Sequence, residues 1–211
     1  MYSRIAGTGR CLPDKVVTNF DLEKMVDTTD EWIRTRTGIE RRHLVREGET
    51  TCDLAEGAAR MAMEAAGVSS QDIDFIVVGS TTPDQVFPNL GCLLQDRLGI
   101  HGCTAFSLEA ACTGFIYALG IADKFVRAGE ARCALVIGAE TLSRIVDWTD
   151  RQTCVLFGDG AGAAILQPSE ETGILSTHLH AEEDEARDAV PGLVRFHRSV
   201  GAADCRACSA R

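Results

Sequence analysis

Residues 106–115 read FSLEAACTGF, and this stretch joins a short apolar run to a helical pattern. Before it, residues 104–108 have the character of a strand. After Cys112, apolar residues recur at the spacing of one buried helix face, at Phe115, Ala118, Leu119, Ala122, Phe125 and Val126. The sequence therefore predicts a strand, a sharp turn and a helix, with Cys112 at the helix start.

The residues around Cys112 suit a nucleophile. A helix start offers unpaired backbone N–H groups and the positive end of the helix dipole, so a thiol placed there is expected to ionise more readily than a free cysteine. Its neighbours Ala110, Ala111, Thr113 and Gly114 are small, which permits a sharp turn and leaves space at the sulfur. The alternative is a buried cysteine that acts only as a small apolar side chain.

The alternation of strand and helix patterns continues along the chain. Strands are predicted over residues 3–9, 41–45, 74–81, 104–108, 133–139, 157–166 and 173–180. Helices are predicted over 22–26, with Asn19 or Asp21 as the cap, and over 27–38, 51–67, 89–98 and 112–128. This order indicates an α/β fold, in which catalytic groups tend to follow the carboxyl ends of strands, as Cys112 does.

Composition excludes several classes of function. The 211 residues are 45% hydrophobic and 25% charged, as in ordinary globular proteins, and form one large domain or two small ones. A net charge of −10 argues against general binding of nucleic acid or anionic membranes. The N-terminus lacks the apolar core of a signal peptide, and no apolar run approaches the roughly 20 residues of a membrane span. We therefore expect a cytoplasmic protein.

Nine cysteines without a signal peptide are expected to stay reduced. Cys205 and Cys208 form an isolated C-x-x-C pair without the second ligand pair of a zinc site, so no metal is expected. Besides Cys112, the others lie singly among apolar neighbours and are interpreted as packing residues: Cys11, Cys52, Cys92, Cys103, Cys133 and Cys154.

A second candidate site lies in residues 27–39, DTTDEWIRTRTGI. Trp32 and Arg36 are four residues apart on a predicted helix and share one face. An aromatic ring beside a guanidinium can stack on a nucleotide base and hold a phosphate. The alternative here is a half-buried tryptophan next to a solvated arginine.

Three motifs in this order resemble the β-ketoacyl-[acyl-carrier-protein] synthase III family of thiolase-like condensing enzymes. They are DTTDEWIRTRTGI at 27–39, EAACTGF at 109–115 and FGDGAGAAIL at 157–166, and the resemblance runs from Tyr2 to about His180. By itself the glycine-rich third motif does not have phosphate-loop spacing and suits a strand approached closely by other backbone. The resemblance implies a thiolase-like α/β fold, here an N-terminal βαβαβαββ half with helices on both faces of a mixed sheet.

The resemblance also implies a role for each matching residue. Cys112 would be the nucleophile that takes an acyl group from acyl-CoA, and its own N–H would supply half of the oxyanion hole. Trp32 and Arg151 would stack on the adenine of CoA, with Thr28 and Arg36 along the nucleotide.

Further implications concern partners. Phe87 would reach across a homodimer interface and help to close the partner's acyl pocket. The expected substrates are acyl-CoA and malonyl-acyl carrier protein, which would condense with loss of carbon dioxide to give 3-oxoacyl-acyl carrier protein. No cofactor is implied, because acyl-CoA is a substrate.

The chain departs from the family after about residue 180. The acidic run EEDE at 182–185 is followed by residues 187–211, which lack a helical or strand period. We therefore expect a thiolase-like half over 1–180 and a weakly ordered tail over 181–211, from truncation or a frame shift. The histidine and asparagine that the family contributes from a second half have no recognisable counterpart, so at most the acylation step is expected.

Two other functions remain open from the sequence. One is a catalytically incomplete fragment that only pairs through the family's dimer surface, which would leave apolar area exposed. The other is a related enzyme with the same cysteine turn, such as a polyketide starter synthase or a hydroxymethylglutaryl-CoA synthase.

Overall fold

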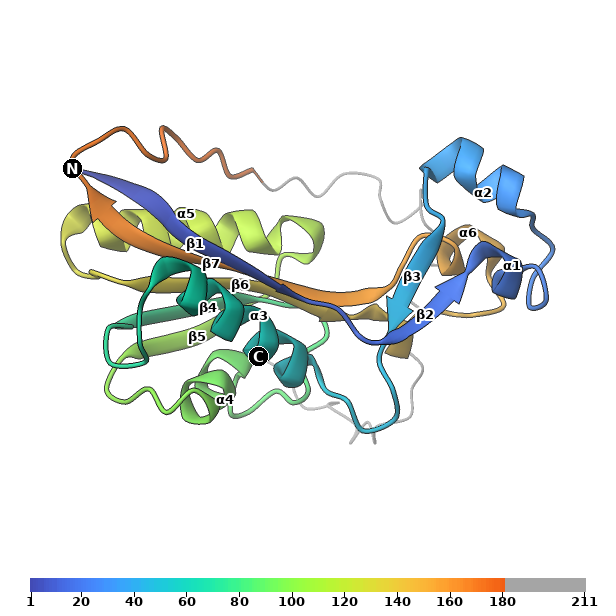
Figure 1. Ribbon diagram of the computed structural model, residues 1–211, viewed down its shortest axis with the longest axis horizontal. Coiled ribbons are helices and arrows are strands. Elements are labelled where there is room, and N and C mark those ends of the chain that lie inside the picture. Colours follow the sequence, from blue (N-terminus) through green and yellow to red (C-terminus); the bar gives the residue numbers. More distant parts are fainter. Residues whose placement is uncertain (181–211) are drawn as a thin grey trace, which may run out of the picture.

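A five-stranded mixed sheet forms the centre of the chain in the computed structural model, which describes residues 1–180 (Figure 1). Its strands are β1 (Tyr2–Cys11), β4 (Phe75–Gly79), β5 (Thr104–Leu108), β6 (Ala134–Thr141) and β7 (Asp159–Ser169). They lie in the order β1-β7-β6-β4-β5. β4 pairs in parallel with β5 and β6, whereas β7 pairs antiparallel with β6 and β1. The predicted mixed sheet is confirmed.

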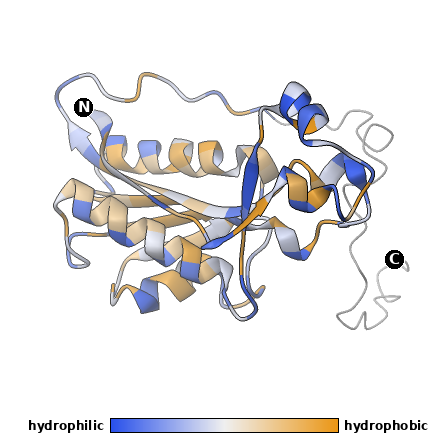
Figure 2. Cartoon of the chain, turned by 45° about the vertical axis from the view of Figure 1, so that its right-hand side comes forward, coloured by the Kyte–Doolittle hydropathy of each residue, from blue (hydrophilic) through white to orange (hydrophobic). Residues whose placement is uncertain are grey.

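Helices cover both faces of this sheet. α3 (Thr51–Ala66) and α4 (Leu90–Arg97) pack on one face, and α5 (Gly114–Ala128) packs on the other (Figure 1). β4 is buried on both sides, because Ile76 and Val78 join the core under α3 while Phe75 and Val77 join the core under α5. The helices present both hydrophobic and hydrophilic residues (Figure 2), as amphipathic cover should. The predicted βαβαβαββ order of the main sheet is confirmed.

A smaller unit interrupts this order between β1 and α3. The antiparallel strands β2 (Lys15–Thr18) and β3 (Arg41–Leu44) enclose α1 (Asn19–Leu22) and α2 (Asp30–Thr37). The short helix α6 (Arg151–Cys154) lies at the same end of the molecule (Figure 1). A separate apolar cluster, formed by Leu22, Ile33, Cys154 and Val155, joins these helices. Residues far apart in the sequence thus share one compact unit.

The start of this unit differs from the sequence-based expectation. α1 begins at Asn19 and is capped by Thr18, not by Asn19 or Asp21. The Thr18 hydroxyl accepts from Asp21 N–H at 3.3 Å, and the Asp21 carboxylate accepts from Thr18 N–H at 3.0 Å. This capping box fixes the helix three residues earlier than the apolar spacing indicated. The four-residue strand β2 was not predicted at all.

The strand predicted over residues 173–180 is wrong. Ile174 N–H donates to Ser3 O at 2.8 Å, but the segment then runs along α5 instead of the sheet. Tyr117 Oη donates to His180 O at 3.0 Å, and Lys124 Nζ donates to Thr177 Oγ1 at 3.2 Å. Hydrogen bonds from side chains of α5 thus take the place of the backbone hydrogen bonds that a sheet strand would make. The predictions for residues 181–211, including Cys205 and Cys208, lie outside the described residues.

Most of the cysteines interpreted as packing residues pack as expected. Cys52, Cys133 and Cys154 are buried, and Cys11 and Cys103 contact the main core. Cys92 is half-buried on α4 and donates to Ala105 O at 3.5 Å. Between residues 1 and 180 no group of acidic, cysteine or histidine side chains could hold a metal ion. In the same range no helix is long and apolar enough to cross a membrane.

Buried thiols are expected to make stability depend on alkaline pH. Burial raises the pKa of both Cys52 and Cys133 to about 11. Because an unfolded cysteine ionises near about pH 8.5, the unfolded chain loses these protons first, and the free energy of unfolding falls as the pH rises from about 9 to 11. The expected loss is about 1 to 2 kcal/mol per cysteine.

Urea denaturation at several pH values would measure this loss. The matched variant Cys52→Ala/Cys133→Ala lacks both thiols, so its stability should fall less steeply over the same range than that of the unmodified chain. If the free energy of unfolding falls equally steeply with pH in the two proteins, the raised pKa of the buried Cys52 and Cys133 is not the cause of the loss.

Candidate active site

Cys112 lies on a tight turn between β5 and α5. One turn of 3-10 helix, η1 (Ala111–Thr113), contains it, and α5 begins only at Gly114. The prediction that the helix starts at Cys112 is therefore wrong by two residues. The Cys112 side chain is exposed and, within the described chain, makes no hydrogen bond, so it is not a core residue. Its role as a nucleophile stays a prediction.

Backbone geometry makes this turn sharp. Ala111 has φ of 44°, the only positive φ at a non-glycine residue in the described part of the chain. This conformation costs of order 1 kcal/mol for a residue with a side chain. The Thr113 hydroxyl and N–H both donate to Ala110 O, at 2.8 and 3.1 Å, and close the turn. The strained backbone displays the sulfur at the surface.

The end of β4 supports the turn from below. A Cβ at Gly79 would lie 2.6 Å from the carbonyl carbon of Gly114, so the two backbones are in direct contact. Ser80 N–H donates to Leu108 O at 3.1 Å, which continues the pairing of β4 with β5 up to the turn. Only glycine at position 79 permits this approach.

The second predicted site lies around Trp32, and we call Trp32, Arg36 and Arg151 together the Trp32 site. The guanidinium carbon of Arg36 lies 5.1 Å from the ring centroid, which confirms that both side chains share one face of α2. Arg151, the first residue of α6, contributes a second guanidinium at 4.5 Å. Trp32 is half-buried, whereas Arg36 is exposed. Two cations therefore contact one aromatic ring.

Local sequence explains how α2 presents this ring. Thr29 caps the helix by accepting from Trp32 N–H at 3.1 Å, and Gly38 ends it in the left-handed conformation with φ of 73°. The Thr28 hydroxyl oxygen is buried and makes no hydrogen bond in the described structure. Because buried polar groups normally have hydrogen-bond partners, this unpaired hydroxyl marks a position where a ligand could supply one.

Phe87 stands apart from both groups. It lies on the loop between β4 and α4 with 89% of its surface exposed, beside Val86 at 92%. Neither residue belongs to an apolar cluster of the described chain. The predicted contact with a second copy stays a prediction.

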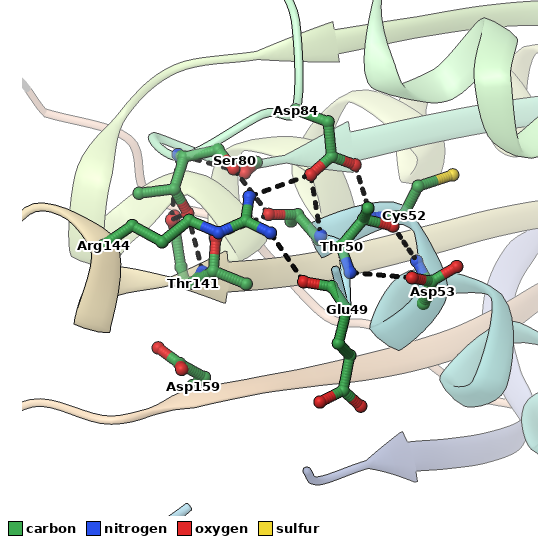
Figure 3. A network of polar contacts seen from close by, with 12 residues as sticks. Glu49, Thr50, Cys52, Asp53, Ser80, Asp84, Thr141, Arg144 and Asp159 are labelled. Atoms are coloured by element: carbon green, nitrogen blue, oxygen red, sulfur yellow. Dashed lines mark hydrogen bonds and ion pairs between the residues drawn. The ribbon is translucent and has the colours of Figure 1, made fainter. Parts of the chain in front are cut away.

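A polar network that the sequence did not reveal anchors this loop (Figure 3). The Asp84 carboxylate accepts from Thr51 and Cys52 N–H, each at 2.8 Å, at the start of α3. Arg144 donates to Asp84 Oδ1 at 3.1 Å and to Glu49 O at 2.6 Å. The base of the loop is thus fixed while Val86 and Phe87 project from it. The sequence could not predict this network, because its residues are far apart in the chain and follow no helix or strand period.

Strand directions place the two predicted sites at one end of the sheet. β5 and β6 both run parallel to β4, so their carboxyl ends coincide. Cys112 follows β5, and Arg151 follows β6 after η2 (Leu142–Arg144). This is the edge at which α/β proteins bind their ligands.

A mixed sheet covered on both faces, with an exposed cysteine on a strained strand–helix turn, agrees with the thiolase-like fold expected from the sequence. Residues 106–183 match the family model of 3-oxoacyl-[acyl-carrier-protein] synthase III. A β-ketoacyl-[acyl-carrier-protein] synthase III from Thioalkalivibrio sulfidiphilus is 71% identical over 181 residues, which are 86% of this chain and 56% of that protein. The counterpart from Xanthomonas campestris is 66% identical over 182 residues, with the same coverage.

Solved structures agree with these relatives. The 3-oxoacyl-[acyl-carrier-protein] synthase III of Aquifex aeolicus has 53% identity and a TM-score of 0.78 over 80% of this chain and 55% of its own. A priming β-ketosynthase of the R1128 polyketide pathway has 39% identity and the same TM-score over 81% of this chain and 51% of its own. The chain is thus similar to proteins named β-ketoacyl-[acyl-carrier-protein] synthase III and spans about half the length of the curated relatives it matches.

Proposed function

We propose that this chain takes an acyl group from acyl-CoA onto Cys112, the first step of the synthase III reaction that starts fatty-acid synthesis. The observation that carries the proposal is the exposed thiol on a strained turn, at the same end of the sheet as the Trp32 site. High identity to proteins named as synthase III supports the choice of reaction.

The proposed step is a thioester exchange. The Cys112 sulfur attacks the thioester carbonyl, and a new carbon–sulfur bond forms as the bond to the CoA sulfur breaks. The proton lost by Cys112 leaves through solvent, and the departing CoA thiolate takes up a proton. Backbone N–H groups at the turn would stabilise the negative oxygen of the intermediate. Cys112 is exposed, so an incoming thioester can reach its sulfur.

The Trp32 site would hold the nucleotide of CoA. The adenine would stack with Trp32 and Arg151. Within residues 1–180, the Arg151 side chain makes one other contact, an exposed ion pair with Asp27 at 3.9 Å. Arg36 would contact phosphate, and the unpaired Thr28 hydroxyl would hydrogen-bond to the nucleotide.

The proposal extends to the later step and to partners. The acyl group would condense with malonyl-acyl carrier protein in the cytoplasm, without a cofactor, in a homodimer in which Phe87 of one copy closes the pocket of the other. Two alternatives keep specific support. The exposed Val86 and Phe87 favour a fragment that only dimerises, and the similarity to the R1128 enzyme favours a polyketide starter synthase.

Labelling with acetyl-CoA tests the acylation step. Incubation with acetyl-CoA labelled in the acetyl group, followed by digestion at acidic pH, should place one label per chain on the peptide that contains Cys112. Label on another peptide would refute the assignment. A chain that stays unlabelled but sediments as a dimer would favour the dimerising fragment, and labelling by longer starter groups in preference to acetyl would favour the polyketide alternative.

A further inference from the structure

A buried arginine lies on β3, in the same small unit as Trp32. Arg42, on β3, is only 4% exposed, and no carboxylate pairs with it in the described chain. Its Nη2 donates to Val155 O at 2.9 Å, directly after α6. Nη1 and Nη2 also donate to Asn19 Oδ1, at 3.0 and 3.1 Å. A buried charge without a counterion depends on such acceptors, so their loss is costly.

Asn19, which accepts these bonds, is fully buried and uses its whole side chain. Its Nδ2 donates to Asp30 Oδ1 and to Ile39 O, both at 2.8 Å, while Oδ1 faces Arg42. This arrangement fixes the orientation of the amide, because a flipped side chain would place its N–H₂ group against the guanidinium. We call Asn19, Asp30 and Arg42 the Asn19 cluster.

The Asn19 cluster connects the elements that carry the ring and its cations. Asn19 begins α1, Asp30 begins α2, and the bond to Val155 reaches the end of α6. Apolar packing holds α2 on one side, where Ile33 is buried and Trp32 packs against the small apolar cluster. The Asn19 cluster adds a polar anchor at Asp30, two residues from Trp32.

We propose that Asn19 and Arg42 are positioning residues, which hold α2 against α6 so that Trp32 and Arg151 stack. The ligand part of this inference, the nucleotide of CoA, rests on the proposed function. The stacking part does not, because the 4.5 Å contact is present in the chain alone.

The indole N–H resonance of Trp32 in the full chain, assigned with Trp32→Phe, reports the stack directly. Asn19→Ala and Arg42→Met should shift it and should weaken binding of CoA about tenfold. Asp30→Ala should shift it in the same direction, and because Asp30 is only partly buried this variant keeps the test informative if the other two do not fold. Arg42→Lys keeps the charge, so its Trp32 resonance and its affinity for CoA should lie between those of Arg42→Met and those of the unmodified chain.

Two variants serve as matched controls. Arg34→Gln removes the exposed ion pairs of Arg34 with Asp30 at 3.7 Å and with Glu40 at 3.2 Å, and it leaves the hydrogen bonds of the cluster intact. Ser3→Ala removes a buried hydrogen bond to Asp123, near the N-terminal end of β1 and far from α2 (Figure 1). Both should leave the Trp32 resonance unchanged.

If the Trp32 resonance does not move in folded Asp30→Ala, Asn19→Ala or Arg42→Met, the positioning role is overturned, even if the affinity for CoA changes. An unmodified chain that does not bind CoA, while these variants shift the resonance, would instead reject the proposed function and keep the positioning role. A shift that Ser3→Ala reproduces would show general loosening and would also overturn the proposal.

Discussion

Replacing Cys112 with alanine is expected to abolish acyl transfer from acyl-CoA. The variant removes the sulfur that forms the proposed thioester, so covalent labelling should fall by at least about a hundredfold, well within the roughly millionfold loss that removal of a catalytic nucleophile can cause. Because the side chain is exposed and makes no hydrogen bond in the described chain, its removal should leave folding stability unchanged. Radiolabel incorporation and a urea titration on the same preparation would measure both quantities.

The control for this variant is Cys92→Ala. Cys92 is a half-buried thiol on α4, which packs on the opposite face of the sheet from α5, and its loss should leave labelling intact. Trp32→Ala makes a further contrast, since it should raise the acyl-CoA concentration needed for half-maximal labelling but not the final extent. Undiminished labelling of Cys112→Ala would eliminate the proposed nucleophile.

Replacing Gly9 with alanine is expected to cost about 3 kcal/mol of folding stability or more, since it overpacks the main core. A Cβ at position 9 would lie far inside van der Waals contact with Ala58 O and Ala62 N, which are backbone atoms of α3 and cannot rotate away. The helix would have to move off β1 along its length. Thermal melting followed by circular dichroism would measure the loss.

Gly162→Ala is the matched control on the neighbouring strand. Gly162 lies on β7 opposite Arg10, and the atom nearest to a Cβ built there is 4.0 Å away, an ordinary contact. Its substitution should change the melting temperature little. Equal destabilisation by the two variants would mean that the close approach of α3 to β1 does not limit stability.

Much of the fold could be predicted from the sequence because its signals are local. Apolar spacing and a final glycine define α3, and a continuous apolar run rich in β-branched residues defines β4. The spacing of Trp32 and Arg36 likewise indicates their shared face. Arg151 joined this pair only through resemblance to a known family, because no periodicity connects residues so far apart.

The remaining features depend on tertiary contacts. Arg42 follows Arg41 in the sequence, and such a pair usually lies in solvent, yet the pleat of β3 turns Arg42 inward onto Asn19. The positive φ of Ala111 could not be predicted from the sequence, because glycine is the residue that usually occupies such a position. The segment 173–180 alternates like a strand, but its polar groups find partners on α5.

The pairing of β1 with β7 has a consequence for biosynthesis. Tyr2 lies opposite Ser169, so β1, which is synthesised before the other strands of the described sheet, has its partner among the last residues of that sheet. Contacts between such distant segments form slowly. Until β7 emerges, β1 and the small-residue face of α3 that it covers stay open to chaperones, and nascent chains that stop before β7 cannot complete the sheet.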